Sequence, residues 1–217
     1  MDNRNRWNRV CSQAAMVVLV GVVLTGQGEA QLLRTFSGHA GPVRSVAYSP
    51  DGTKVLTGSQ DRTAILWDAD TGAVLRVFSE TSSVFSVAFS PDGTKVLTGS
   101  HHAKLWDVET GTEIGTFSNY IYGVNSVAFS PDGTKVLTGG DDTADLWDAV
   151  TGALIRTFSG HTESVCAVAF SPDGAKMLTG GYDMTAKLWN AETGALIRTI
   201  LGHTGSVNSV MFFPGRF

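Results

Sequence analysis

The sequence predicts an all-β fold made of several copies of one small antiparallel sheet. The segment SPDGTKVLTG occurs letter for letter at 49–58, 90–99 and 130–139, and SPDGAKMLTG follows at 171–180. The prolines of these segments stand 41, 40 and 41 residues apart. No helical periodicity interrupts the copies, and 25 glycines against 6 prolines indicate many tight turns between short strands.

Each copy divides into four short strands. In the first copy, the apolar run VRSVAYS ends at a Pro-Asp-Gly turn (50–52), in which proline presets one dihedral and glycine takes the positive-φ position. KVLTG follows as a second strand, TAILWD as a third, and AVLRVF as a fourth after an Asp-Thr-Gly turn (70–72). A small sheet with two apolar faces cannot bury both alone, so neighbouring sheets must stack.

A second motif keeps the same period: LWD occurs at 66–68, 105–107 and 146–148, and LWN at 188–190. The dipeptide GH occurs at 38–39, 160–161 and 202–203. Paired GH and WD motifs at this spacing are typical of propeller arrays. The chain resembles the WD-repeat β-propeller family over nearly all of residues 32–217. We therefore expect four complete four-stranded blades plus a partial fifth, in an incomplete or open ring. The repeats run over 32–73, 74–112, 113–153 and 154–195, with a partial copy at 196–217. The resemblance also implies that LLRTF (32–36) is an outer strand of the last blade.

The partial fifth copy predicts one inner strand, NSVMFF (208–213), and Gly215 stands where the SPDG pattern has aspartate. Closed propellers have 4–8 blades, and members of the family most often have seven. The sequence therefore favours a truncated or fragmentary reading frame over a compact four-blade closure or an assembly of chains. An open arc would expose apolar blade faces that favour self-association.

The first thirty residues predict a secretory signal peptide. Arg4, Arg6 and Arg9 precede an apolar core of 11 residues (14–24), and Gly28 and Ala30 occupy the small-residue positions that signal peptidase reads. A membrane span needs about 20 apolar residues. We expect cleavage after Ala30 and a secreted or periplasmic product, with an uncleaved membrane anchor as the alternative.

Charge and cysteine content exclude several classes of function. The net charge is -4 with no run of lysines or arginines, which argues against nucleic-acid and anionic-membrane partners. Two cysteines cannot form a disulfide framework, and Cys166, in the apolar segment VCAVAF, is expected to be buried and inert. His101 and His102 are adjacent on a strand and point opposite ways, so no metal site and no cofactor are predicted.

The family resemblance implies a hydrogen-bonded network of a histidine, a hydroxyl, an aspartate and a tryptophan in each blade. The matching positions are His39, Thr57, Asp61 and Trp67 in the first repeat and His161, Thr179, Asp183 and Trp189 in the fourth. The alternative is a Ser/Thr–His–Asp catalytic unit. Because the set recurs with the fold period, we interpret it as stabilising, and we predict no catalytic residues and no enzyme activity.

Repeats two and three depart from this pattern. Repeat two has Glu80-Thr81 instead of GH and lacks the aspartate, with His102 near that place. Repeat three has Asn119-Tyr120 instead of GH, and two adjacent aspartates, 141 and 142, compete for the acidic position. The hydrogen-bonded networks of these two blades are therefore expected to stabilise them less than those of blades one and four do.

The sequence favours a non-catalytic protein–protein interaction scaffold. The alternatives are the propeller portion of a larger envelope enzyme and a non-functional fragment. The candidate binding face carries the loops between strands four and one and between strands two and three, which vary while the strands are nearly copied. Tyr120 and Tyr122 lie in the loop of repeat three. The family resemblance implies that further residues surround them on the same face, namely Arg44, Gln60, Phe85, Asn125 and Tyr182.

Tyr120 and Tyr122 are the strongest candidates, because exposed aromatic side chains dominate interface energies. Two alternatives stay open from sequence. One of the tyrosines folds into the space that the missing histidine leaves, or the loop variation is neutral drift.

Overall fold

The computed structural model describes residues 20–24 and 30–213, and every regular element within them is a strand. No helix in these ranges has the length and apolarity needed to cross a membrane. The basic flank of the predicted signal segment and most of its apolar core lie outside the described residues, as does Gly28.

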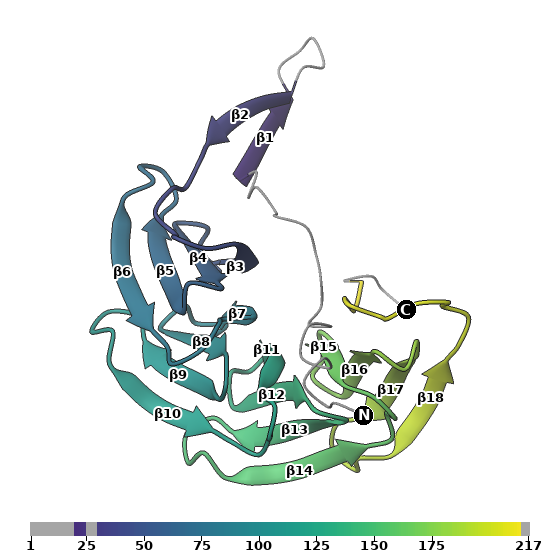
Figure 1. Cartoon of the computed structure of the whole chain (residues 1–217). Coiled ribbons are helices and arrows are strands. Elements are labelled where there is room, and N and C mark those ends of the chain that lie inside the picture. Colours follow the sequence, from purple (N-terminus) through teal and green to yellow (C-terminus); the bar gives the residue numbers. More distant parts are fainter. Residues whose placement is uncertain (1–19, 25–29, 214–217) are drawn as a thin grey trace, which may run out of the picture.

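Four antiparallel sheets of four strands each confirm the predicted blades. Figure 1 shows them side by side in an open arc, with the first strand of each sheet on the concave side and the fourth on the rim. Sheet one is β3 (Val43–Tyr48), β4 (Lys54–Ser59), β5 (Thr63–Asp68) and β6 (Val74–Ser79); sheet two is β7 (Ser86–Phe89), β8 (Lys95–Gly99), β9 (Ala103–Asp107) and β10 (Glu113–Phe117); sheet three is β11 (Val124–Phe129), β12 (Lys135–Gly140), β13 (Thr143–Asp148) and β14 (Leu154–Ser159); sheet four is β15 (Val165–Phe170), β16 (Lys176–Gly181), β17 (Ala186–Asn190) and β18 (Leu196–Ile200).

The Pro-Asp-Gly turns join the first two strands of each sheet as predicted. Gly52 has a φ of 71°, the left-handed conformation that favours glycine. The Ser49 hydroxyl donates to Asp51 Oδ1 at 2.6 Å, and the amide of Lys54 donates back to Ser49 Oγ at 2.9 Å. The Ser49 hydroxyl, the Thr53 amide and the Thr53 hydroxyl stabilise the carboxylate and hold the pKa of Asp51 at about 2. The turn is therefore rigid in each copy.

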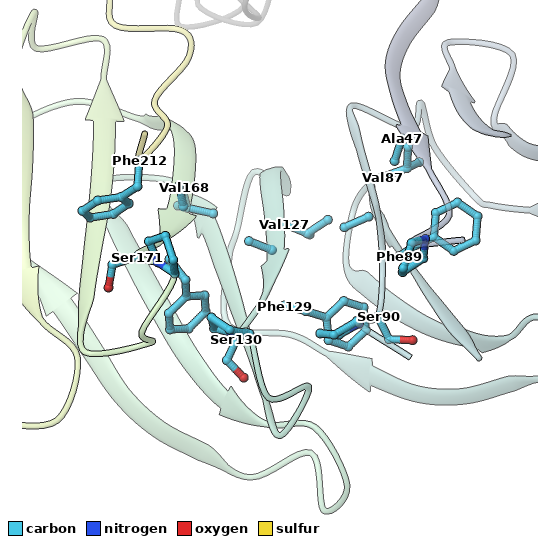
Figure 2. A pocket seen from close by; sticks show the side chains of 18 of the residues that line it. Ala47, Val87, Phe89, Ser90, Val127, Phe129, Ser130, Val168, Ser171 and Phe212 are labelled. Carbon is cyan, nitrogen blue, oxygen red and sulfur yellow. The ribbon is translucent and has the colours of Figure 1, made fainter. Parts of the chain in front are cut away.

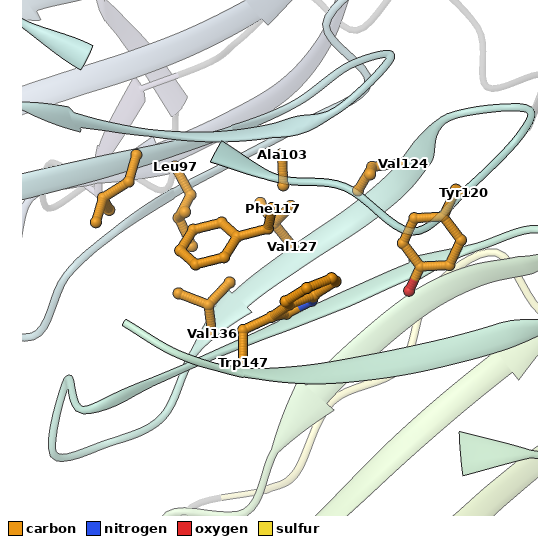
Figure 3. Close-up of a cluster of buried hydrophobic side chains, with 9 residues drawn as sticks. Leu97, Ala103, Phe117, Tyr120, Val124, Val127, Val136 and Trp147 are labelled. Atoms are coloured by element: carbon orange, nitrogen blue, oxygen red, sulfur yellow. The ribbon is translucent and has the colours of Figure 1, made fainter. Parts of the chain in front are cut away.

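The sheets pack through two faces of different composition. One face of each sheet carries two leucines and an alanine, together with a phenylalanine from the rim strand in sheets one to three and Ile200 in sheet four; we refer to it as the Leu face. The opposite face carries two valines from the first strand or the residues just before it, an apolar residue from the second strand and the tryptophan from the third; we refer to it as the Trp face. Figure 3 shows the Leu face of sheet two against the Trp face of sheet three, with Leu97 and Phe117 opposite Val136 and Trp147. The same pairing joins sheets one and two and sheets three and four.

A glycine on the second strand lets the sheets approach closely. A Cβ on Gly139 would lie 2.8 Å from side-chain atoms of both Val165 and Val168. The valine pair of each following sheet fits over the equivalent glycine, Gly58 or Gly99, in the same way. A side chain at these glycines would force neighbouring sheets apart.

The chain on either side of the four sheets differs from the prediction. β2 (Ala30–Arg34) pairs with β1 (Val20–Leu24) and not with a blade, although Phe36, which follows it, lies over Trp67 with ring centroids 5.6 Å apart. The predicted inner strand at 208–213 does not form, because no second strand follows to pair with it in the described residues. Val207 and Val210 nevertheless lie over Gly180, and the Val207 amide donates to the Gly181 carbonyl at 3.0 Å.

Candidate functional site

One buried hydrogen bond is common to all four sheets. The indole Nε1–H of the tryptophan on the third strand donates to the threonine hydroxyl on the second strand, at 2.8 or 2.9 Å. Each threonine is buried, so its remaining hydrogen-bonding capacity must be satisfied inside the protein. The pairs are Trp67–Thr57, Trp106–Thr98, Trp147–Thr138 and Trp189–Thr179.

In sheet one the threonine meets a histidine held by a carboxylate. His39 Nε2 lies 2.7 Å from Thr57 Oγ1, and His39 Nδ1 lies 2.8 Å from Asp61 Oδ2. Sheet four repeats these distances with His161, Thr179 and Asp183. The structure thus brings together all eight residues that the sequence grouped.

The environment shifts the pKa values of both acid and base. Burial opposes ionisation of Asp61, but hydrogen bonds from Thr63 and His39 outweigh it and hold the pKa of this carboxyl at about 2. Burial lowers the pKa of His161, against the pull of Asp183. His161 is therefore a neutral hydrogen-bonding bridge at neutral pH.

The sequence analysis did not include Thr63 and Thr185 in these networks. The Thr63 hydroxyl donates to Asp61 Oδ1 at 2.6 Å, and the Thr185 hydroxyl donates to Asp183 Oδ1 at 2.7 Å. The spacing Asp-x-Thr, present in both repeats, was the signal that could have identified them.

In sheet two, Glu80 takes the histidine's role. The Thr98 hydroxyl donates to Glu80 Oε1, and the Glu80 side chain is only 1% exposed. Lys104 Nζ lies 3.7 Å from Glu80 and 2.9 Å from Glu113, so it links the buried acid to one nearer the surface. Burial raises the pKa of Glu80, which Thr98 and Lys104 only partly offset.

In sheet three, Tyr120 corrects the prediction of a binding residue. It is buried, at 7% exposure, and its hydroxyl lies 2.9 Å from the Thr138 carbonyl and 3.0 Å from Thr138 Oγ1. Figure 3 shows its ring beside Trp147 and Val124 within the core. The tyrosine fills the place that histidine has in sheets one and four, which was the alternative the sequence left open.

The loop beyond Tyr120 presents two exposed apolar side chains. Ile121 is 75% exposed and Tyr122 is 61% exposed. Asp141 accepts hydrogen bonds from both of their amides, at 3.0 and 3.2 Å, whereas Asp142 is exposed. A buried anchor and a carboxylate cap therefore fix this loop, and it projects Ile121 and Tyr122 from a defined backbone.

The other residues predicted for this face are partly buried. With the Gln60 amide oxygen turned toward Arg44, it accepts from the guanidinium Nε at 3.0 Å. The Asn125 side chain donates to the Val165 carbonyl at 3.1 Å and so links neighbouring sheets. Phe85 and Tyr182 are half-buried. Of the seven predicted residues, Tyr122 is thus the one with a largely exposed side chain.

The opposite edge of the arc contains a hollow that the sequence analysis missed. Its volume is about 410 Å³, and it is lined by the ends of the first strands and by the prolines that follow them. Figure 2 shows Phe89, Phe129 and Phe212 around it. The aromatic residue just before each Ser-Pro pair was the signal for this lining.

Two further predictions concern cysteine and metal chemistry. Cys166 is buried, as expected. His101 and His102 were wrongly placed on a strand with side chains pointing opposite ways: they lie in the bend before β9, and their ring centroids are 4.5 Å apart. Residues 20–24 and 30–213 hold no group of three or more His, Cys, Asp or Glu side chains arranged to bind a metal ion.

Comparison with known proteins agrees with this geometry. A family model described as "WD domain, G-beta repeat" matches residues 30–68, 72–107, 111–148 and 152–190. A guanine nucleotide-binding protein subunit beta of Oryza sativa subsp. indica is 47% identical over 47 residues, which are 22% of this chain and 12% of that protein. Small ribosomal subunit protein RACK1z of Arabidopsis thaliana is 34% identical over 81 residues, 37% of this chain and 25% of the relative.

A third relative is WD repeat, SAM and U-box domain-containing protein 1 of Danio rerio, 36% identical over 67 residues, 30% of this chain and 14% of that protein. The chain thus spans a quarter or less of the length of these three relatives. Proteins with these repeats generally act as scaffolds for protein interactions, and no catalytic family is indicated. The four repeat matches, the four sheets and the recurring Trp–Thr pairs show that this chain belongs to the WD40 repeat family.

Proposed function

We propose that this protein is an exported, non-catalytic scaffold that binds a protein partner through the loop 119–123 and its surroundings. The observation that carries the proposal is the fixed projection of Ile121 and Tyr122 by the buried Tyr120 and the Asp141 cap. Binding costs less when a loop is already ordered, because no conformational entropy is lost on contact. Exposed aromatic and aliphatic anchors on a rigid frame are typical of the energetic centre of an interface.

The histidine–aspartate pairs fit a stabilising role in this proposal. In sheet one, Thr57 is 2% exposed and its oxygen accepts a hydrogen bond from Trp67, so a substrate has no access to it as a nucleophile. Sheets two and three keep the same threonine and tryptophan with Glu80 or Tyr120 in the third position. A catalytic triad would not tolerate this exchange of the base, whereas a structural network does.

Export is the second part of the proposal. It is supported by the arginine flank, the 11-residue apolar core and the small-x-small exit at Gly28 and Ala30. N-terminal sequencing of the product from the cell exterior or envelope should begin at Gln31. Recovery of intact Met1 in a soluble cytoplasmic fraction would contradict export without affecting the binding proposal.

Site-specific photocrosslinking tests the binding face. A photoreactive phenylalanine analogue at position 122 should crosslink to a discrete partner in envelope extract, and Ile121→Ser should lower the yield. The matched control is the same analogue at Tyr48, which is 47% exposed on the opposite edge of the arc. Equal crosslinking at both positions, or crosslinking only at position 48, would show that this loop is not the binding site.

A further inference from the structure

The two ends of the arc carry complementary halves of one repeated interface. Within the chain, each Leu face packs on the Trp face of the next sheet, three times over. Four sheets therefore leave two faces without a partner sheet among the described residues: the Leu face of sheet four and the Trp face of sheet one.

The Leu face of sheet four is incompletely covered. Leu178 and Leu188 are partly exposed, whereas the equivalent Leu137 and Leu146 of sheet three are fully buried. Ile200 has the position of Phe158 and is 40% exposed. The short segment with Val207 and Val210 covers only the strip over Gly180. Apolar surface that is buried at every other sheet is therefore left in water here.

A polar contact is also left unmade at this end. On the rim strand before two of the three interfaces, an arginine reaches over the Thr-Gly turn of the next sheet and donates to its carbonyls. Arg76 Nη1 donates to Thr110 O at 2.9 Å, and Arg156 Nη2 donates to Glu192 O at 3.1 Å. Arg198 has the equivalent place in sheet four, and it is exposed and makes no hydrogen bond to any described residue. The acceptor that would suit it is another Thr-Gly turn of this kind.

The chain itself contains the matching surface. Residues 32–48 (LLRTFSGHAGPVRSVAY) and 196–212 (LIRTILGHTGSVNSVMF) are identical at 9 of 17 positions. Each end segment covers part of one free face: Phe36 lies over Trp67 of sheet one, and Val207 and Val210 lie over Gly180 of sheet four. In the alignment Phe36 corresponds to Ile200, and Val207 and Val210 correspond to Val43 and Val46. Each end of the chain therefore carries residues of the kind that cover the face at the other end.

We propose that two copies of this chain associate head to tail, with the Leu face of sheet four of one copy on the Trp face of sheet one of the other. In this arrangement, Ile200 of one copy takes the place of Phe36 over Trp67 of the other. Arg198 of the first copy likewise takes the place of Arg34, which within one chain donates to the Thr71 carbonyl at 2.7 Å. Val43 and Val46, both partly exposed, replace the valine pair over Gly180. The displaced contacts are remade by residues of the same kind.

The additional stabilisation comes from burying Leu178 and Leu188 against the second copy. A head-to-tail contact closes only if its rotation returns to the start. Two copies with two such contacts supply eight blades, the upper end of the range over which propellers usually close. The expected product is thus a closed dimer and not an open filament.

Sedimentation velocity of the full chain over a range of concentrations tests this arrangement. We expect a species of twice the 23.0 kDa chain mass and no larger one. Ile200→Glu should be monomeric, since it places a carboxylate in the apolar contact. The matched control is Ile197→Glu, which alters the other face of the same strand at 47% exposure and should remain dimeric.

A mixing experiment tests the polarity of the contact. Val46→Asp, on the Trp face, should be monomeric alone, and an equimolar mixture with Ile200→Glu should form a dimer, because each variant retains one intact face. If Val46→Asp proves unfolded by circular dichroism, Val46→Thr replaces it and should weaken the dimer at least tenfold. A monomeric wild type, an unlimited ladder of oligomers, or a dimer that survives Ile200→Glu would overturn the proposal.

Discussion

Blades one and four differ from blades two and three in the third partner of the Trp–Thr pair. In blades one and four, a histidine that also contacts an aspartate lies next to the threonine. In blade two the partner is Glu80, which pairs with Lys104, and in blade three it is Tyr120. The threonine, the tryptophan and the distance between them stay the same. The comparison shows that the fold requires a buried polar group that reaches this hydroxyl, whereas the chemistry of that group is free to change.

The three kinds of partner differ in how they stabilise the fold. Tyr120 needs no charge and adds a large apolar ring to the core, so it is insensitive to pH in the physiological range. Glu80 brings a carboxylate into a buried place, which is costly unless it is paired. The prediction that the networks of blades two and three contribute less stability than those of blades one and four can be tested with single substitutions.

The largest effect is expected at Tyr120. Tyr120→Ala removes a buried aromatic ring and should cost about 3–5 kcal/mol in the free energy of unfolding. Tyr122→Ala, two residues along the same loop and 61% exposed, should change it by less than about 0.5 kcal/mol. Urea denaturation of both variants measures the difference, and similar losses would show that the loop does not pack as described.

The histidine network should have the next largest effect. His161→Ala leaves the Thr179 hydroxyl and Asp183 without their partner and should cost about 1–3 kcal/mol. His203 stands at the same place in the fifth copy but is exposed, so His203→Ala should be nearly neutral. Thermal unfolding compares them, and an equal loss from both would contradict a role confined to the buried network.

Blades two and four should respond to pH with opposite sign. Burial lowers the pKa of His161, so its contribution is present above pH about 6.5 and is lost as pH falls toward the lowered pKa. Burial raises the pKa of Glu80, so its contribution is full below pH about 4.5 and is lost as pH rises through the raised pKa.

Denaturation from pH 8 to pH 4 tests this contrast. The free energy of unfolding of Glu80→Gln, relative to that of the wild type, should be highest at high pH. That of His161→Gln should be highest, relative to the wild type, at low pH. Lys104 stays charged throughout this range because its pKa is raised, and the lowered pKa values of Glu113 and Asp183 keep both carboxyl groups ionised over most of it. Two parallel pH profiles would refute the assignment.

The smallest effect concerns a contact that one blade lacks. Gly115 occupies the place of the bridging arginine in sheet two, and the Gly152 turn of sheet three has no side chain over it. A Cβ at position 115 would meet only ordinary contacts, 3.7 Å from Leu105. Gly115→Arg should therefore raise stability by about 0.5–1.5 kcal/mol. Gly115→Ala is the control, because it restricts the backbone of the unfolded chain without adding a guanidinium group. An equal increase in the free energy of unfolding from this variant would show that the guanidinium adds nothing.

The sequence predicted most of the fold and only part of the site. The strands and the Pro-Asp-Gly turns followed from residues that recur with a fixed spacing, and both histidine networks followed from the family resemblance. The other two networks were missed because the prediction required a histidine. Glu80 and Tyr120 each stand 18 residues before the threonine that they contact, which is the same separation as in the two histidine networks. The spacing is therefore preserved, and what the pattern did not show is that another buried polar side chain can replace the histidine. The strand at 208–213 was wrong because a strand needs a partner that the described chain does not supply.

The complementary faces also bear on how such a chain lengthens in evolution. A sheet with a Leu face on one side and a Trp face on the other can be inserted between any two sheets without redesigning either neighbour. A duplicated stretch of about 40 residues therefore arrives with both of its contacts already encoded. Near-identical neighbouring copies such as SPDGTKVLTG at 90–99 and 130–139 are well placed to recombine unequally, so blade number can change in a single genetic step while every remaining contact is preserved.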